Sequence, residues 1–323
     1  MKNLLHSARM LAGPQSSMMS TRYWKYLIRA VAIYPLTRRW LGYLMDDEQR
    51  AEMTRCNTQL LLKLQRPYIR KNISLREKLS ILEAHYDFMD RHLTSHLRQA
   101  LYQTGRLALG ECVGKSGQRY RVELNPTRSF DKEGELMVCL IAPSNEGVLT
   151  RAVFSIRQDA GGYAMEIGCL QGPRRNLGNE AIKTATRDLH GLRPKNLVMR
   201  CLYDLAKQWG IQRVYAVAGR FHVYHTPFRR QRTISADYDS FWEELGGQLT
   251  TNGRFALPPE QPRKKLEEID SKKRAQYVRR FSLEDDLSSS ISEALAISTP
   301  PAIQSGQVLI LQPAFLNRFH QAA

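Results

Sequence analysis

Four short apolar segments decide the fold of this chain: QRYRVEL (118–124), LMVCLIA (136–142), LTRAVFSIRQ (149–158) and YAMEIGCL (163–170). Each has the length of a strand, and the first alternates polar with apolar side chains, which is the period of a strand with one buried face. Turn-forming residues separate the segments at the spacing of hairpins. We therefore predict four consecutive strands of an antiparallel meander.

The residues before the meander have a helical pattern. One apolar stripe recurs at i, i+3, i+4 and i+7, formed by Trp24, Leu27, Ile28 and Val31. Further along, Ser74 and Glu77 have the spacing of a capping box, which predicts a helix starting at that point. We predict a flexible tail over residues 1–21 and a helical domain over residues 22–106.

The residues after the meander change pattern again. Helices are predicted near 179–189 and 194–209, followed by an apolar strand over 214–218. This order predicts an α+β protein in which the helical layer precedes a mixed, mainly antiparallel α/β sheet domain over residues 107–282. Serines, prolines and low charge predict a second flexible tail over residues 283–323.

The charge balance is strongly basic. The chain has 48 Lys and Arg against 31 Asp and Glu, a net charge of +17, and no acidic residue before Asp46. Such a balance favours anionic partners: nucleic acid, phospholipid headgroups or phosphorylated cofactors.

The cysteine pattern indicates the redox environment of the protein. The 5 cysteines are scattered singly, without a Cys-x-x-Cys pair, which argues against a disulfide framework and a zinc site. We expect no metal and a reducing compartment. Neither a secretory signal nor a membrane-spanning segment is visible, so we predict a cytoplasmic protein, with peripheral membrane contact as a further option.

Several motifs in the second half resemble one bacterial family. They are LQG (170–172), LHGLRPKNLVM (189–199), AVAGRFHVYH (216–225), DYDSFWEELGG (237–247) and SKKRAQYVRR (271–280). Together they resemble the VirK/YbjX family, over roughly residues 22–285. The resemblance implies a role in virulence and in resistance to host antimicrobial peptides, near the envelope stress response. It carries no established catalytic residue with it.

A second resemblance is architectural. Four antiparallel strands, a helix entered through a glycine turn and a buried strand follow the order found in Gcn5-related N-acetyltransferases. That resemblance implies that the turn over residues 191–196 binds the pyrophosphate of coenzyme A or the phosphopantetheine phosphate of acyl carrier protein. The family's Arg/Gln-x-x-Gly-x-Gly/Ala signature is absent here, and fold analogy alone establishes no chemistry.

Two basic segments are candidates for binding this cofactor. Arg193, Lys195 and Asn196 surround Pro194, where a helix start offers free N–H groups to an anion. Alternatively, both basic side chains are solvated or pair with acidic neighbours, for which Glu180 and Asp188 are candidates. A second basic pair, Arg174 and Arg175, follows the fourth strand, and an exposed solubilising loop is the alternative there.

Three residues are candidates for acid–base chemistry. Glu166 lies within the fourth strand and is a general base if it is partly buried, although the alternation favours a solvent-facing side chain. His222 and His225 follow the buried strand, where open α/β sheets place ligands, with Asp237 or Asp239 as the partner carboxylate. The alternative is that both histidines are structural.

The N-terminal segment over residues 23–45 mixes aromatic, aliphatic and basic residues without an acid. This composition suits an interfacial helix on anionic lipid, and the alternative is a first helix with its aromatic rings in the core. The basic segment 271–280 fits nucleic acid less well, because acidic residues lie close by.

The leading functional hypothesis is a factor of the VirK/YbjX type that supports envelope integrity and antimicrobial-peptide resistance. Its sheet domain is acyltransferase-like and binds acyl-coenzyme A or acyl carrier protein. Whether it catalyses a reaction is left open by the sequence. The alternative is a non-catalytic basic adaptor that binds RNA or anionic membrane lipid.

Overall fold

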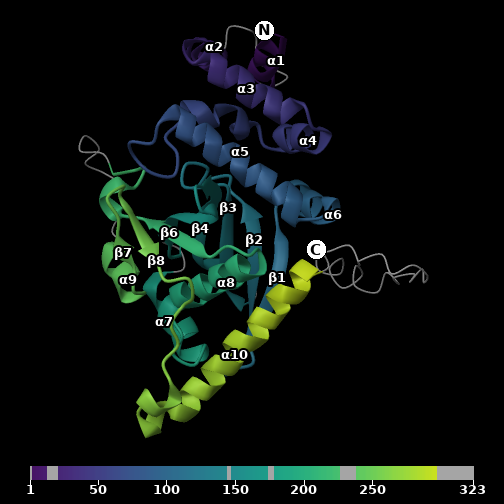
Figure 1. Cartoon of the computed structure of the whole chain (residues 1–323). Coiled ribbons are helices and arrows are strands. Elements are labelled where there is room, and N and C mark those ends of the chain that lie inside the picture. The colour runs from purple at the N-terminus through teal and green to yellow at the C-terminus, as the bar shows by residue number, and fades with distance from the viewer. Residues whose placement is uncertain (1, 13–20, 144–146, 174–177, 226–237, 297–323) are drawn as a thin grey trace, which may run out of the picture.

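The computed structural model describes residues 2–12, 21–143, 147–173, 178–225 and 238–296. Figure 1 shows a stack of N-terminal helices at one end, a twisted sheet in the middle and a long helix, α10, running along the sheet domain. The arrangement is α+β with a mixed, mainly antiparallel sheet, as predicted.

The N-terminal layer consists of short helices and one long one. Its elements are α1 (Lys2–Ala12), α2 (Thr21–Ala32), α3 (Tyr34–Met45), α4 (Glu48–Cys56), the 3-10 helix η1 (Thr58–Gln65), α5 (Leu75–His92), α6 (Ser95–Gln99) and the π-helix η2 (Ala100–Thr104). The predicted cap is present, because the hydroxyl of Ser74 accepts a hydrogen bond from the Glu77 N–H.

The sheet follows the layer and contains the predicted meander. Its strands are β1 (Leu107–Val113), β2 (Arg119–Pro126), β3 (Leu136–Ile141), β4 (Val148–Asp159), β5 (Gly162–Gln171), β6 (Arg213–Val217), β7 (Gln248–Leu249) and β8 (Arg254–Leu257). Their order is β1-β2-β3-β4-β5-β6-β8-β7. The β5–β6 pair is parallel and the other neighbouring pairs are antiparallel. A parallel pair needs a crossover, which α7 (Gly178–Asp188) and α8 (Pro194–Gln208) supply.

Helices cover both faces of the sheet. On β4, Phe154 belongs to the same apolar cluster as α8, whereas the neighbouring Ser155 meets the hydroxyl of Tyr68 from the N-terminal layer. Ser155 and Glu166 are register partners on β4 and β5, so Glu166 also faces the N-terminal layer. This second cover explains why strand alternation gave a wrong result for Glu166: its side chain is fully buried and does not face solvent.

Both predicted tails contain ordered helix. In the segment predicted as a loose N-terminal tail, α1 buries Leu4 and Ala8 against the N-terminal layer. At the other end, α10 (Ser271–Ala296) continues well past residue 282. It does so because apolar side chains spaced four residues apart are buried against the sheet domain: Leu283, Leu287, Ile291 and Leu295. Residues 297–323 lie outside the described residues.

Candidate functional site

The turn that leads into α8 is built from backbone conformations that few residues adopt. His190 and Gly191 both have positive φ, 52° and 78°, which reverses the chain after α7. Pro194 then occupies the start of α8, where a missing N–H costs no hydrogen bond. Arg193 is the N-cap residue and makes no side-chain cap, so its guanidinium is directed to other partners.

The basic side chains of this turn meet one carboxylate. Arg193 forms an ion pair with Glu244, the last residue of α9 (Tyr238–Glu244), and the Lys195 ammonium lies 4.0 Å from the same carboxylate. The Lys195 ammonium also lies 3.9 Å from the centroid of the Phe241 ring. The acidic neighbours suggested by the sequence have other partners: Asp188 accepts from Tyr120 and Glu180 pairs with Lys183.

Together with α9 and α10, this turn encloses a cleft of about 580 Å³, which we call the α8 cleft. Its charged walls carry more basic than acidic side chains: Arg193, Arg200, Arg263, Lys264 and Arg280 against Glu244, Glu268 and Glu284. The rings of Tyr277 and Phe281 and the polar side chain of Asn196 also line it. The volume is that of a small-molecule site, and the mainly charged and polar lining favours a charged ligand.

The guanidiniums of Arg193 and Arg280, which both line this cleft, repel each other. The pKa of Arg193 is lowered, first by burial and then by the positive charge of Arg280. Arg280 pairs with Glu284, 3.2 Å away, and Arg263 pairs with the same carboxylate at 3.0 Å. Arg263 also pairs with Asp285 at 2.7 Å, so two carboxylates balance these two arginines. A bound anion would relieve the repulsion that remains between Arg193 and Arg280.

Glu166 lies elsewhere, in a cluster of arginines. Its carboxylate is 2.7 Å from Arg157, 3.3 Å from Arg254 and 3.3 Å from Arg70. Burial is the main cause that lowers the pKa of Arg254. The negative charge of Glu166 raises this pKa, and the positive charges of Arg157 and Arg70 lower it further. Glu166 belongs to none of the described pockets. A general-base role for Glu166 stays a prediction, and its contacts with three arginines are those of a structural ion cluster.

His222 is buried and His225 is exposed, so they do not share an environment. The His222 Nε2 atom lies 3.9 Å from Glu133, and its ring stacks on Tyr238 of α9. Burial, and then the neighbouring His225, lowers the pKa of His222 to about 4. His222 is therefore neutral near neutral pH, and its contact with Glu133 is not an ion pair.

The carboxylate next to His222 was not expected from the sequence. Of the two suggested partners, Asp239 accepts a hydrogen bond from the Gly219 N–H, and Asp237 lies outside the described residues. Glu133 takes this place because its backbone crosses β5 at Gly168, where an added Cβ would lie 1.8 Å from the Glu133 carbonyl oxygen. Only glycine tolerates that approach.

The predicted site residues do not form one constellation. Lys195 and Asn196 belong to α8 and Arg193 is its N-cap residue, and this helix packs on the face of the sheet that carries Phe154. Glu166 faces the N-terminal layer on the opposite face. The other two candidates, Arg174 and Arg175, lie outside the described residues.

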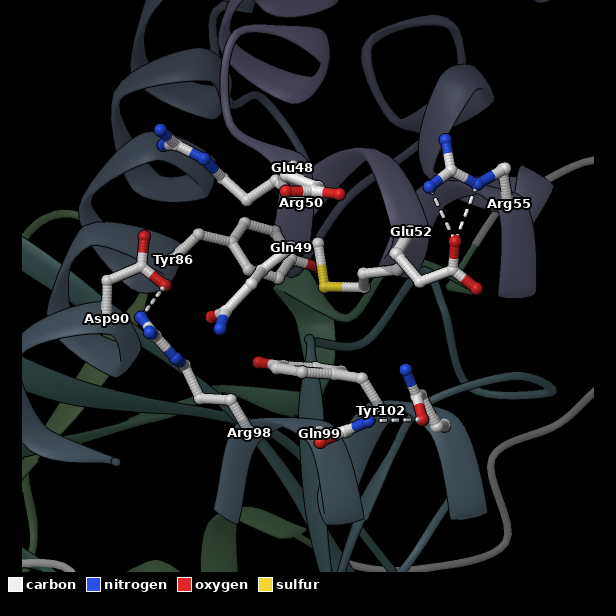
Figure 2. A pocket seen from close by; sticks show the side chains of 12 residues that line it. Glu48, Gln49, Arg50, Glu52, Arg55, Tyr86, Asp90, Arg98, Gln99 and Tyr102 are labelled. Carbon is white, nitrogen blue, oxygen red and sulfur yellow. Dashed lines mark hydrogen bonds and ion pairs between the residues drawn. The ribbon is translucent and has the colours of Figure 1, made fainter. Parts of the chain in front are cut away.

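A second pocket, of about 340 Å³, lies between α4, α5 and η2 (Figure 2). Figure 2 shows Tyr86 and Tyr102 facing this space, and the π-helix η2 carries Tyr102. Its charged side chains largely pair with one another, as Arg98 with Asp90 at 2.5 Å. The pocket therefore suits an uncharged group better than a phosphate. Sequence analysis missed it, because its walls come from separate helices and share no local pattern.

Two further properties concern the part of the chain that the structure describes. Within it, no group of three or more His, Cys, Asp or Glu side chains is arranged to hold a metal ion. None of its helices combines the length and the apolar character needed to cross a bilayer.

Comparisons with known proteins identify relatives over most of the chain. The family model described as "Protein of unknown function (DUF535)" matches residues 16–293. The uncharacterized protein YbjX of Escherichia coli (strain K12) is 31% identical over 264 residues, covering 81% of this chain and 79% of that protein. An uncharacterized protein of Haemophilus influenzae is 25% identical over 226 residues, covering 69% of this chain and 73% of that protein.

Among solved structures, the chain is similar to a mutant of a cAMP-binding acyltransferase from Mycobacterium smegmatis. The TM-score is 0.30 at 11% identity, covering 71% of this chain and 63% of that one. A likeness at this distance supports no inference about activity.

Proposed function

Since the chain belongs to the DUF535 family, which includes YbjX, we propose its function from the geometry of the α8 cleft: the protein binds a phosphate-bearing ligand there. The observation that carries this proposal is the excess of basic over acidic side chains around a cleft of small-molecule size, with two guanidiniums that repel each other. Guanidinium groups bind phosphate through paired, planar hydrogen bonds.

The leading ligand is the phosphopantetheine group of acyl-coenzyme A or acyl carrier protein. Two features support this choice. The cleft lies at the N-terminal end of α8, where the helix dipole favours a phosphate. The rings of Tyr277 and Phe281 add apolar surface beside the cations, which suits a ligand that is charged at one end only.

Catalysis is not part of this proposal, because none of the three predicted bases, Glu166, His222 and His225, lines the cleft. Glu166 is enclosed by arginines on the other face of the sheet, and His222 stacks on the opposite end of α9 from Glu244. The proposed activity is therefore binding of an acyl donor, with acyl transfer as the reaction to assay if a donor binds.

At the cellular level, we infer a cytoplasmic factor that supports envelope integrity and resistance to antimicrobial peptides. The support is membership of the family that includes YbjX, together with the motifs of the second half of the chain. The test is a deletion strain exposed to a cationic antimicrobial peptide. Complementation by the wild type but not by Arg193→Glu would link resistance to the α8 cleft. Equal complementation by both proteins would show that resistance does not depend on the cleft.

The second candidate function is a non-catalytic adaptor for RNA or anionic lipid, and the net charge of +17 favours it. Salt distinguishes the two functions. Binding through counterion release weakens steeply as salt rises, whereas a pocket ligand held by rings and directed hydrogen bonds retains its preference.

A thermal-shift screen tests the proposal. Purified protein is titrated with coenzyme A, acyl-coenzyme A, acyl carrier protein, RNA and heparin at low and moderate salt. A ligand at about a hundred times its dissociation constant stabilises the native state by about 2.7 kcal/mol. Stabilisation by the pantetheine ligands that persists in salt supports the proposal, and equal, salt-sensitive shifts with every polyanion contradict it.

A further inference from the structure

Helix α2 presents an uncovered apolar surface at the end of the molecule. Trp24, Ile28 and Val31 are 53%, 68% and 58% exposed, although they recur at the spacing that normally marks a buried helix face. Of the four residues of the predicted stripe, these three point outward, whereas Leu27 is partly buried against the apolar cluster of the N-terminal layer. Large apolar side chains gathered on one exposed face mark an interaction site more often than isolated ones do.

The opposite face of α2 fixes the helix to the protein. Tyr23, Tyr26 and Ala30 are buried in the apolar cluster of the N-terminal layer, and the Tyr26 hydroxyl is hydrogen-bonded to Ser7 of α1 at 2.8 Å. The exposed stripe is therefore held on a packed helix. Figure 1 shows α1, α2 and α3 stacked at the end of the molecule that lies away from the sheet.

The charges around the stripe specify one kind of partner. Lys25 and Arg29 are exposed and each follows a stripe residue by one position, which places them about 100° further round the helix. Lys2 and Arg9 of α1 are exposed as well. No acidic residue occurs before Asp46, so nothing in these first helices offsets the positive charge.

We propose that the exposed face of α2 docks on an anionic lipid bilayer, with the Trp24, Ile28 and Val31 side chains in the interface and Lys25 and Arg29 at the phosphate headgroups. An interfacial helix combines an apolar face with a basic polar face in this way. Tryptophan prefers the interface, because its ring is apolar and its N–H remains solvated. This surface is separate from the α8 cleft and does not depend on it.

The tryptophans provide a direct signal for this docking. The chain has 4 tryptophans. Trp40, Trp209 and Trp242 are at most 6% exposed, so Trp24 is the tryptophan whose surroundings docking would change. The full-length protein is mixed with vesicles of phosphatidylcholine alone or with about a third phosphatidylglycerol. Blue-shifted emission and protection from acrylamide quenching are expected only with the anionic vesicles, and Trp24→Phe should abolish both changes.

Flotation of the same vesicles measures affinity. Lys25→Glu with Arg29→Glu should weaken binding more than twentyfold, because each cation near an anionic surface contributes about fivefold. Lys272→Glu with Lys273→Glu, at exposed positions of α10, is the control for net charge and should bind nearly as the wild type does. Ile28→Ser with Val31→Ser should also weaken binding, whereas Val113→Ser with Val278→Ser, at positions 48% and 50% exposed, should not.

Three results would overturn the proposal. One is absence of wild-type flotation on anionic vesicles at low salt. Another is equal loss of binding in the α2 and α10 charge variants, which would make the attraction one of net charge only. The third is a wild-type dimer that Ile28→Ser with Val31→Ser converts to a monomer in sedimentation velocity, since the stripe would then be covered by a second copy.

Discussion

Glu166 and Arg157 are joined by a 2.7 Å hydrogen bond in the interior, where the glutamate side chain has no exposed surface. Arg254 and Arg70 approach the same carboxylate, each at 3.3 Å. The three arginines come from β4, β8 and the segment before α5, and Glu77 of α5 also pairs with Arg70 and Arg157. Glu166 therefore joins the N-terminal layer to the sheet together with Glu77. The cluster is a structural junction whose loss is measurable.

We predict that Glu166→Gln destabilises the protein by about 3–5 kcal/mol, because Arg254 loses its carboxylate partner and Glu77 alone is left to balance Arg70 and Arg157. The free energy of unfolding in urea measures this loss. The matched control is Glu111→Gln, which breaks an ion pair with Arg119 whose side chains are 41% and 71% exposed and should cost less than about 1 kcal/mol. Equal losses in both variants would refute the structural role and return Glu166 to the candidates for catalysis.

Stability should fall as the pH is lowered from 7 to 5. Burial lowers the pKa of His85 to about 4 and that of His222 to about 4, whereas an unfolded histidine has a pKa of about 6.5. Between these values the unfolded chain binds protons that the folded chain does not. The resulting loss is about 2 kcal/mol for each histidine at pH 5.

His85→Gln tests the origin of this pH dependence. The Ile156 N–H donates a hydrogen bond of 3.1 Å to His85 Nδ1. Glutamine keeps an acceptor for this N–H but removes the titrating imidazole. The slope of unfolding free energy against pH should become shallower between pH 5 and 7. The same substitution at exposed His96 is the control. An unchanged slope in His85→Gln would show that the acid sensitivity has another source.

The second half of α10 should contribute to stability. Leu287 is fully buried in the cluster shared with β1 and α8, so Leu287→Ala should cost about 2–5 kcal/mol. Val278 lies on the same helix and is 50% exposed, and Val278→Ala should change stability by less than about 0.5 kcal/mol. Urea denaturation compares the two variants. Small losses of stability in both variants would instead support the predicted end of the folded domain at residue 282.

The regular part of the sheet was predictable from local patterns. The four predicted segments of the meander correspond to β2, β3, β4 and β5. They were predictable because strand lengths and hairpin turns depend on residues that are consecutive in the sequence. The first strand, β1, was missed, since LALGECV directly follows a helical pattern and contains a central glycine. The continuation of α10 was missed because Ser288–Ser290 resembled a linker, although the buried residues recur every four positions.

The site depended on contacts that no local pattern contains. Arg193 pairs with Glu244, which is 51 positions away, and the facing wall of the cleft comes from α10. Pro194 and its basic neighbours marked one edge of the cleft correctly, because a helix start is a local feature. The burial of Glu166 required knowing that the N-terminal layer covers the second face of the sheet. The family resemblance given by the motifs is confirmed by the DUF535 match.

The most direct measurement is the affinity of coenzyme A for the full-length protein by isothermal titration calorimetry at two salt concentrations. Arg280→Glu and Arg193→Glu should each weaken binding about 10–100-fold, because a hydrogen bond to a charged group contributes about 1.5–3 kcal/mol. Arg279→Glu is the control, since Arg279 is exposed on the same helix and does not line the cleft. The account predicts a wild-type affinity that persists in salt and falls only in the two cleft variants. Equal affinities in all three variants, or no binding by the wild type, would contradict it.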